Sequence, residues 1–165
     1  MLGSYAPQTI VETITINDED DVLFNFDTAI LTLHGNKVLT KFINKTGKDN
    51  IMKIVIDGYT DAIGTKEYNL RLSKERADSV KSFFVAHGFL ADKIITHGYG
   101  EKDVKVSHAC LAKYPQHKHR LRTQLIKCAA PDRKVVIMVE HDRQVEKTIM
   151  ETVPAKDKPV ESSPK

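Results

Sequence analysis

The stretch GYTDAIGTKEYNLRLSKERADSV, residues 58–80, joins the end of a predicted strand to the start of a long predicted helix. The apolar run IMKIVI at residues 51–56 precedes it and is typical of a buried strand. Thr65 follows a glycine and is a favourable N-cap, so we expect the helix to begin there and to run to about Ala86. This strand–loop–helix unit is the strongest fold signal in the chain.

Two opposite charges in this unit could face one ligand. Asp61 lies just past the strand, where loops at the carboxyl end of a sheet commonly bind small molecules. Arg76 lies on the helix, and its guanidinium is suited to a bidentate contact with a carboxylate. Thr60 and Asn69 add neutral donors and acceptors, so the pattern favours a zwitterion such as the free end of an amino acid. The alternative is that Asp61 and Arg76 pair with each other, or serve only the loop and the solvent, because most such charges are structural.

The remaining pattern predicts an α+β or α/β sandwich with helices on one side of a mixed sheet. Alternating or buried apolar residues predict strands at 8–16, 51–58, 93–100 and 133–140, and helical spacing predicts helices at 31–46, 65–86 and 119–130. On the long helix, the residues expected to face the sheet are Leu70, Ala77, Val80 and Phe84. The Ser107–His108 dipeptide is assigned to a loop.

Composition indicates one globular domain. The chain has 165 residues, 41% of them hydrophobic, and a net charge of +3. Its apolar runs are too short to span a bilayer, and the N-terminus lacks the pattern of a signal peptide, so an exported protein would be represented here by a fragment. Basic residues concentrate at 113–122 without stacking aromatics other than Tyr114, so we expect no nucleic-acid binding.

No catalytic or cofactor motif is apparent. Ser73 has no histidine at helical spacing, and the Ser107–His108 pair does not form a nucleophile elbow. The sequence contains neither of the glycine-rich phosphate-binding motifs, G-x-x-x-x-G-K-[ST] and G-x-G-x-x-G in a βαβ context. We therefore expect neither enzyme activity nor a cofactor.

Cys110 and Cys128 leave three readings open. In an oxidising compartment they would form a disulfide. His108, His117 and His119 raise a zinc alternative, but the spacing matches none of the usual structural zinc sites, which favours the disulfide. Two free thiols in a cytosolic protein are the third reading.

The opening stretch resembles the central motif of the OmpA-like domain family, G-H-T-D-x-x-G…N-x-x-L-S-x-x-R-A-x-x-V. VLFNFDTAIL at 22–31 is similar to the F-x-F-D segment of that family, HGYGE at 97–101 to its third-strand turn, and PDRKVVI at 131–137 to its closing N-R-R-V-x-I motif. The resemblance covers about residues 10–140. It implies an α+β fold of βαβαβ(α)β order, with a mixed four-stranded sheet and helices mainly on one face.

The resemblance also implies a function, which is non-covalent binding of peptidoglycan through the meso-diaminopimelate of its stem peptide. The two family residues that hold this amino acid correspond to Asp61 and Arg76. The other positions that match pocket residues of the family are Asp27, Thr60, Asn69, Leu72 and Arg133. Tyr59 replaces the usual histidine, and the neighbours of Arg133 differ from the family pattern, which makes that arginine the least certain member.

The segment around the two cysteines is similar to the periplasmic domains of enterobacterial members. The resemblance therefore implies a Cys110–Cys128 disulfide and a periplasmic domain of an outer-membrane protein, joined to the membrane only through an N-terminal β-barrel outside this chain. Pal-type lipoproteins and MotB-type stator proteins of the family usually lack this cysteine segment; they stay as an alternative, as does a wall-acting envelope enzyme. We expect residues 1–9 to be a linker remnant and 141–165 a mostly disordered tail, with no metal site, and we leave a homodimer open.

Overall fold

In the computed structural model, residues 7–18, 23–25 and 27–144 are described, and they form a four-stranded sheet in the order β1-β4-β2-β3. The strands are β1 (Pro7–Asn17), β2 (Ile51–Tyr59), β3 (Ile94–Gly98) and β4 (Lys134–Gln144). β4 pairs antiparallel with both β1 and β2, whereas β2 pairs parallel with β3. The predicted mixed sheet is therefore confirmed.

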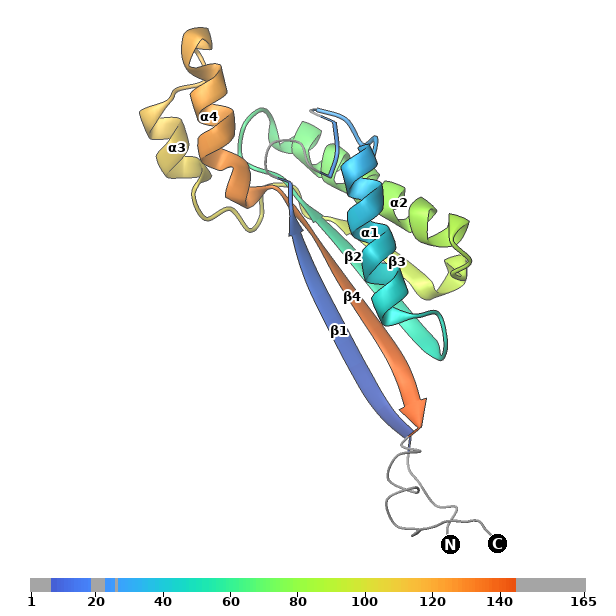
Figure 1. Cartoon of the computed structure of the whole chain (residues 1–165). Coiled ribbons are helices and arrows are strands. Elements are labelled where there is room, and N and C mark those ends of the chain that lie inside the picture. Colours follow the sequence, from blue (N-terminus) through green and yellow to red (C-terminus); the bar gives the residue numbers. More distant parts are fainter. Residues whose placement is uncertain (1–6, 19–22, 26, 145–165) are drawn as a thin grey trace, which may run out of the picture.

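Two long helices and a cluster of short ones accompany the sheet. They are α1 (Leu33–Thr46), α2 (Lys66–Ala86), α3 (Ser107–Lys113) and α4 (Arg122–Ala129), with 3₁₀ turns η2 (Ala91–Lys93), η3 (His119–Leu121) and η4 (Ala130–Asp132). α1 and α2 lie along the sheet, whereas α3 and α4 lie beyond the end of it where β4 begins (Figure 1). Among the described residues, no helix is both long and apolar enough to cross a membrane.

The main core lies between the sheet and the pair α1 and α2. Alternate residues of the two central strands are buried on this side: Ile54, Ile56, Val135, Ile137 and Val139. Phe42 of α1 and Phe84 of α2 pack in a T-shaped arrangement in this core, with ring centroids 6.5 Å apart. Burying each such side chain stabilises the fold by about 1.5–3 kcal/mol, which explains why the alternating pattern predicted these strands well.

The N-terminal half of α2 packs differently from the prediction. Leu70 was expected to face the sheet but is 51% exposed, and it lies beside Gly100 in the turn after β3. Ser73 is buried instead, because the helix backbone approaches the strand here. A Cβ added to Gly58 would lie 2.3 Å from the carbonyl oxygen of Ser73. This close approach leaves no room for a large side chain on the facing side of the helix.

The helix α3 was missed, since residues 107–108 were assigned to a loop. Its N-cap is Val106, which makes no side-chain capping hydrogen bond. The backbone N–H groups of Lys105, Val106 and Ser107 instead donate to the buried carboxylate of Asp132. The cap is thus supplied from 25 residues away in the sequence, so no local signal announced the helix.

Strands β1 and β4 reach further than predicted, because β1 begins at Pro7 and β4 ends at Gln144, whereas β3 is shorter and spans Ile94–Gly98. Residues 1–6 and 145–165 lie outside the described residues. The expected linker and tail therefore stay predictions for those segments.

Candidate functional site

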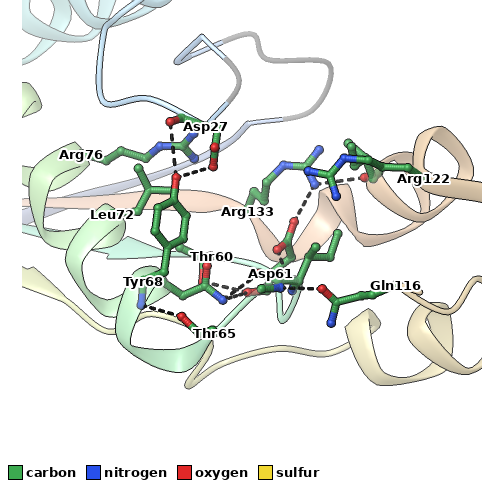
Figure 2. A pocket seen from close by; sticks show the side chains of 14 residues that line it. Asp27, Thr60, Asp61, Thr65, Tyr68, Leu72, Arg76, Gln116, Arg122 and Arg133 are labelled. Atoms are coloured by element: carbon green, nitrogen blue, oxygen red, sulfur yellow. Dashed lines mark hydrogen bonds and ion pairs between the residues drawn. The ribbon is translucent and has the colours of Figure 1, made fainter. Parts of the chain in front are cut away.

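A pocket of about 400 Å³ opens at the end of β2, where the predicted site residues gather (Figure 2). Its lining from the sheet, α2 and the neighbouring loops is Asp27, Thr60, Asp61, Ile63, Gly64, Thr65, Tyr68, Asn69, Leu72, Arg76 and Arg133. Gln116, Arg122 and Ile126 complete the wall from the region around α4. All seven residues named from the sequence line this one pocket.

The loop that carries Asp61 is fixed by its own hydrogen bonds. The side-chain amide of Asn69 donates to the carbonyl oxygens of Asp61, at 3.3 Å, and of Ile63, at 3.0 Å. The N–H of Ile63 donates to Oδ1 of Asp61 at 3.0 Å, and the hydroxyl of Thr60 donates to the Asp61 carbonyl. The Asp61 carboxylate is therefore held in place before any ligand binds.

Asp61 forms a buried ion pair with Arg133. The Arg133 guanidinium donates to Oδ2 of Asp61 at 2.8 Å, and the two side chains are 8% and 11% exposed. The same nitrogen donates to the carbonyl oxygen of Ile126 in α4. The Nε of Arg133 is buried and has no hydrogen-bond partner among the described residues. Arg133 thus lines the pocket and contacts Asp61 directly, while its role in ligand binding stays a prediction.

Arg76 forms a separate ion pair with Asp18. Its guanidinium lies 3.3 Å from Oδ2 of Asp18, with the two side chains 6% and 2% exposed, and it lies 4.9 Å from the ring centroid of Phe24. Nε of Arg76 donates to the carbonyl oxygen of Thr28 at 2.8 Å. Asp18 also accepts from the N–H groups of Leu23 and Phe24. Sequence reasoning missed Asp18, which lies outside the motifs that predicted the site and 58 positions before Arg76.

The structure therefore separates the two charges that the sequence singled out. Asp61 pairs with Arg133 and Arg76 pairs with Asp18, in place of the alternative in which Asp61 and Arg76 neutralise each other. Both nonetheless line the same pocket. Figure 2 shows Arg76 and Asp27 on one side of it and Asp61 nearer the middle. A molecule that carries both signs could contact each pair.

Tyr68 was missed as a site residue. Its hydroxyl donates to Oδ1 of Asp27, whose backbone is in the left-handed region at φ 59°. Burial, followed by this hydrogen bond, raises the pKa of Tyr68 to about 12, so the phenol stays protonated and remains a donor. Its position four and eight residues before Leu72 and Arg76 places it on their face of α2, and that spacing could have identified it.

A disulfide arm, defined as residues 104–131, forms one wall of the pocket through Gln116, Arg122 and Ile126. Cys110 and Cys128 are joined by a disulfide, with their Cα atoms 5.7 Å apart, as the family resemblance implied. The bond leaves neither thiolate for zinc. Cys110, Leu125 and Ala129 form a small buried cluster that is separate from the main core.

Hydrogen bonds connect the arm to the Asp61 loop. The N–H of Ala62 donates to the hydroxyl of Ser107 at 3.1 Å, and the N–H of Gly64 donates to Oε1 of Gln116 at 2.9 Å. Ser107 in turn donates to Asp132. Burial alone would raise the pKa of Asp132, but hydrogen bonds from Ser107, Lys105 and Val106 outweigh it and lower the pKa. The anionic carboxylate therefore holds the arm and, through it, the loop.

The residues on either side of Arg133 have structural roles. Asp132 caps α3, and Lys134 pairs with Asp103 at 2.6 Å. The Lys134 ammonium also lies 5.0 Å from the ring centroid of Tyr59, the residue that replaces the usual histidine. The departures from the family pattern at these positions therefore do not alter the charged groups that line the pocket.

Comparison with known sequences identifies close relatives. The family model for the OmpA family matches residues 23–117. Outer membrane protein A of Klebsiella aerogenes is 40% identical over 139 residues, which are 82% of this chain and 37% of that protein. Outer membrane protein P5 of Haemophilus influenzae is 37% identical over 134 residues, 81% of this chain and 36% of that protein. The chain thus spans little more than a third of the length of these relatives.

Solved structures share the fold. The OmpA-like domain of FopA1 from Francisella tularensis superposes with a TM-score of 0.56 at 22% identity, covering 83% of this chain and 77% of that one. The peptidoglycan-associated lipoprotein from Burkholderia pseudomallei gives 0.52 at 21% identity, covering 72% and 87%.

The matched segment extends over more than half of the chain and contains both Asp61 and Arg76. The identity to the two outer membrane proteins extends over about four fifths of it. The chain therefore belongs to the OmpA family.

Proposed function

We propose that this chain is the periplasmic, wall-anchoring part of a longer outer-membrane protein and that it binds peptidoglycan non-covalently. The names of the relatives, outer membrane proteins A and P5, support the location. The shared fold with a peptidoglycan-associated lipoprotein supports the ligand class. The disulfide fits an oxidising compartment such as the periplasm.

The ligand proposed for the pocket is the meso-diaminopimelate of the stem peptide. Its distal end carries an ammonium, for the Asp61 carboxylate, and a carboxylate, for the Arg76 guanidinium. The observation that carries this proposal is that the two side chains line one pocket while each is held by a different partner. Asp18 and Arg133 orient the two charges in advance, which lowers the entropy that binding must overcome.

The ion pairs with Arg133 and Asp18 do not occupy all the hydrogen-bonding positions of Asp61 and Arg76. A carboxylate can accept at about four lone-pair sites, and a guanidinium has five N–H donors. The charged groups of the ligand can therefore bind to Asp61 and Arg76 while the ion pairs with Arg133 and Asp18 stay in place. Lysine, which replaces diaminopimelate in other cell walls, lacks the distal carboxylate. Its binding would desolvate Arg76 without giving it a new acceptor, at a cost of about 1–3 kcal/mol. Discrimination between the two wall types follows from this difference.

The test is binding of Asp61→Ala and Arg76→Ala to purified sacculi of the diaminopimelate type. Each substitution should lower affinity at least tenfold, because losing one partner of a desolvated charge pair costs about 2–5 kcal/mol. Free meso-diaminopimelate should compete with the wall for the wild-type chain. Sacculi of the lysine type should bind wild type as weakly as the variants bind the diaminopimelate wall.

Asp92→Ala and Arg120→Ala are the matched controls, since both residues are exposed and neither lines the pocket. Circular dichroism must show that all four variants are folded. Folded Asp61→Ala and Arg76→Ala proteins that bind the wall like wild type would rule out this pocket. Release of soluble muropeptides by the wild-type chain would instead point to the enzyme alternative.

A further inference from the structure

The charge of the chain is divided unevenly between the disulfide arm and the rest. Residues 104–131 contain six lysines and arginines and no aspartate or glutamate. The whole chain has a net charge of only +3, so the remaining residues carry 19 basic and 22 acidic groups and are acidic as a whole. All the cations of the arm are exposed. The arm therefore adds positive charge at this end of the sheet.

The arm brings one of its cations to the pocket. Arg122, at the start of α4, lines it together with Gln116 and Ile126. Figure 2 shows the Arg122 side chain extending toward Arg133, on the side of the pocket opposite Arg76 and Asp27. Among the described residues, the charged ones that line this side are one carboxylate, Asp61, and two guanidiniums, Arg122 and Arg133. A guanidinium has five N–H donors, so it can bind an anionic group of the ligand in addition to its contacts within the protein.

The arm is held firmly enough to present Arg122 at a defined position. The disulfide joins α3 to α4, and Leu125 packs one helical turn after Arg122 in the small cluster of the arm. Gln116 is bonded to the N–H of Gly64, and Ile126 accepts from Arg133. The positions of Arg122 and Asp61 are thus linked through short chains of contacts. A ligand in the pocket can touch both.

We infer that Arg122 forms a second recognition subsite, which binds a carboxylate of the stem peptide outside the amino acid held by Asp61 and Arg76. This inference rests on the proposed function and deepens it, since it makes an anionic peptide, and not the single amino acid, the full ligand. The other cations of the arm attract the wall, whose peptides carry many carboxylates, and raise the association rate. Arg122 adds selectivity for the number of carboxylates on the peptide.

The experiment compares two probes across three proteins. The probes are free meso-diaminopimelate and a stem tripeptide that ends in this residue. The tripeptide is used in two forms, one with its glutamate α-carboxylate free and one with this group amidated. The proteins are wild type, Arg122→Gln and Arg120→Gln. Arg120 lies on η3 of the same arm and is exposed, but it does not line the pocket, so its variant removes one charge without touching the subsite.

Amidation should weaken binding of the peptide to wild type about fivefold, as expected for a partly exposed charge pair. Arg122→Gln should lose the same factor for the free-carboxylate peptide and show no further loss on amidation. Its affinity for free diaminopimelate should stay within twofold of wild type. Arg120→Gln should respond to amidation as wild type does.

Two results would overturn the inference while leaving the proposed function intact. One is an Arg122→Gln protein that binds the free-carboxylate peptide like wild type. The other is an equal loss for the peptide and for free diaminopimelate, which would place Arg122 in the primary site. Wild-type protein that binds neither probe would overturn the proposed function and the inference together. Arg122-dependent binding to anionic phospholipid vesicles, with no effect on the peptide, would assign the arm to a membrane surface instead.

Discussion

The pocket has two walls that are stabilised by different means. The wall formed by α2 and the sheet belongs to a core in which 18 of the described residues are buried together. The disulfide arm has a buried cluster of three residues, reinforced by a disulfide and by the hydrogen bonds of one carboxylate. Three buried side chains and a few partly buried ones cannot offset the conformational entropy of about 28 residues by burial alone. The stability of the arm therefore depends on a few groups, whereas the stability of the wall formed by α2 and the sheet depends on many.

The largest expected effect comes from removing the carboxylate of the arm. Asp132→Ala leaves the buried N–H group of Ser107 and the partly buried N–H groups of Lys105 and Val106 without their acceptor. The free energy of opening the arm should fall by about 4 kcal/mol, since each buried unpaired group costs about 1–3 kcal/mol. Hydrogen exchange of α4 amides should then be on the order of 10³-fold faster.

Amides of α2 serve as the internal reference in that measurement, and Asp132→Asn is the matched variant because it retains one oxygen acceptor. Its effect should be smaller than that of Asp132→Ala. If the amides of α2 and α4 accelerate together in Asp132→Ala, the two walls form one cooperative unit and the comparison between them fails.

The disulfide should contribute slightly less. Replacing Cys110 and Cys128 by serine removes the cross-link across 18 residues, which stabilises by about 3 kcal/mol for a loop of this length. The urea midpoint of the arm should fall well below that of the sheet, as followed by proteolysis between residues 113 and 122. The protease resistance of the double variant should equal that of the wild-type protein measured under reducing conditions. Equal protease resistance of the oxidised wild type and the variant would show that packing alone holds the arm.

The smallest of the three effects lies in the helix–sheet wall. Gly58→Ala should lower the free energy of unfolding by about 2 kcal/mol, because the added methyl group meets the Ser73 carbonyl and the α2 backbone must shift. Chemical denaturation followed by circular dichroism measures it. At Gly64 a Cβ would meet nothing within 4 Å, but the backbone is at φ +88°, so Gly64→Ala should cost about 1 kcal/mol from strain alone. A smaller loss at Gly58 than at Gly64 would show that the contact between α2 and β2 yields easily.

The local patterns of the sequence determined the strands, the two long helices and the cap of α2. Thr65 accepts from the N–H of Tyr68, as the predicted N-cap should, and Gly88 follows the helix with φ +95°. These signals are local, because hydrogen bonds between neighbouring residues and the periodicity of burial decide them. The predictions for the burial of Leu70 and for a loop at residues 107–108 were wrong for the opposite reason. The contact of α2 with Gly58 and the cap that Asp132 gives to α3 both involve residues that are distant in the sequence.

The same division applies to the pocket. The sequence by itself determined that an anionic loop and a cationic helix face share one end of a strand, because Asp61 and Arg76 belong to one contiguous unit. Only the tertiary structure decided which charges neutralise them, since Asp18 and Arg133 are separated from their partners by 58 and 72 positions. It also decided that Gln116 and Arg122 join the wall. Side-chain charge is a property of each residue, but the partner of a buried charge depends on which distant segments the packing of the core brings together.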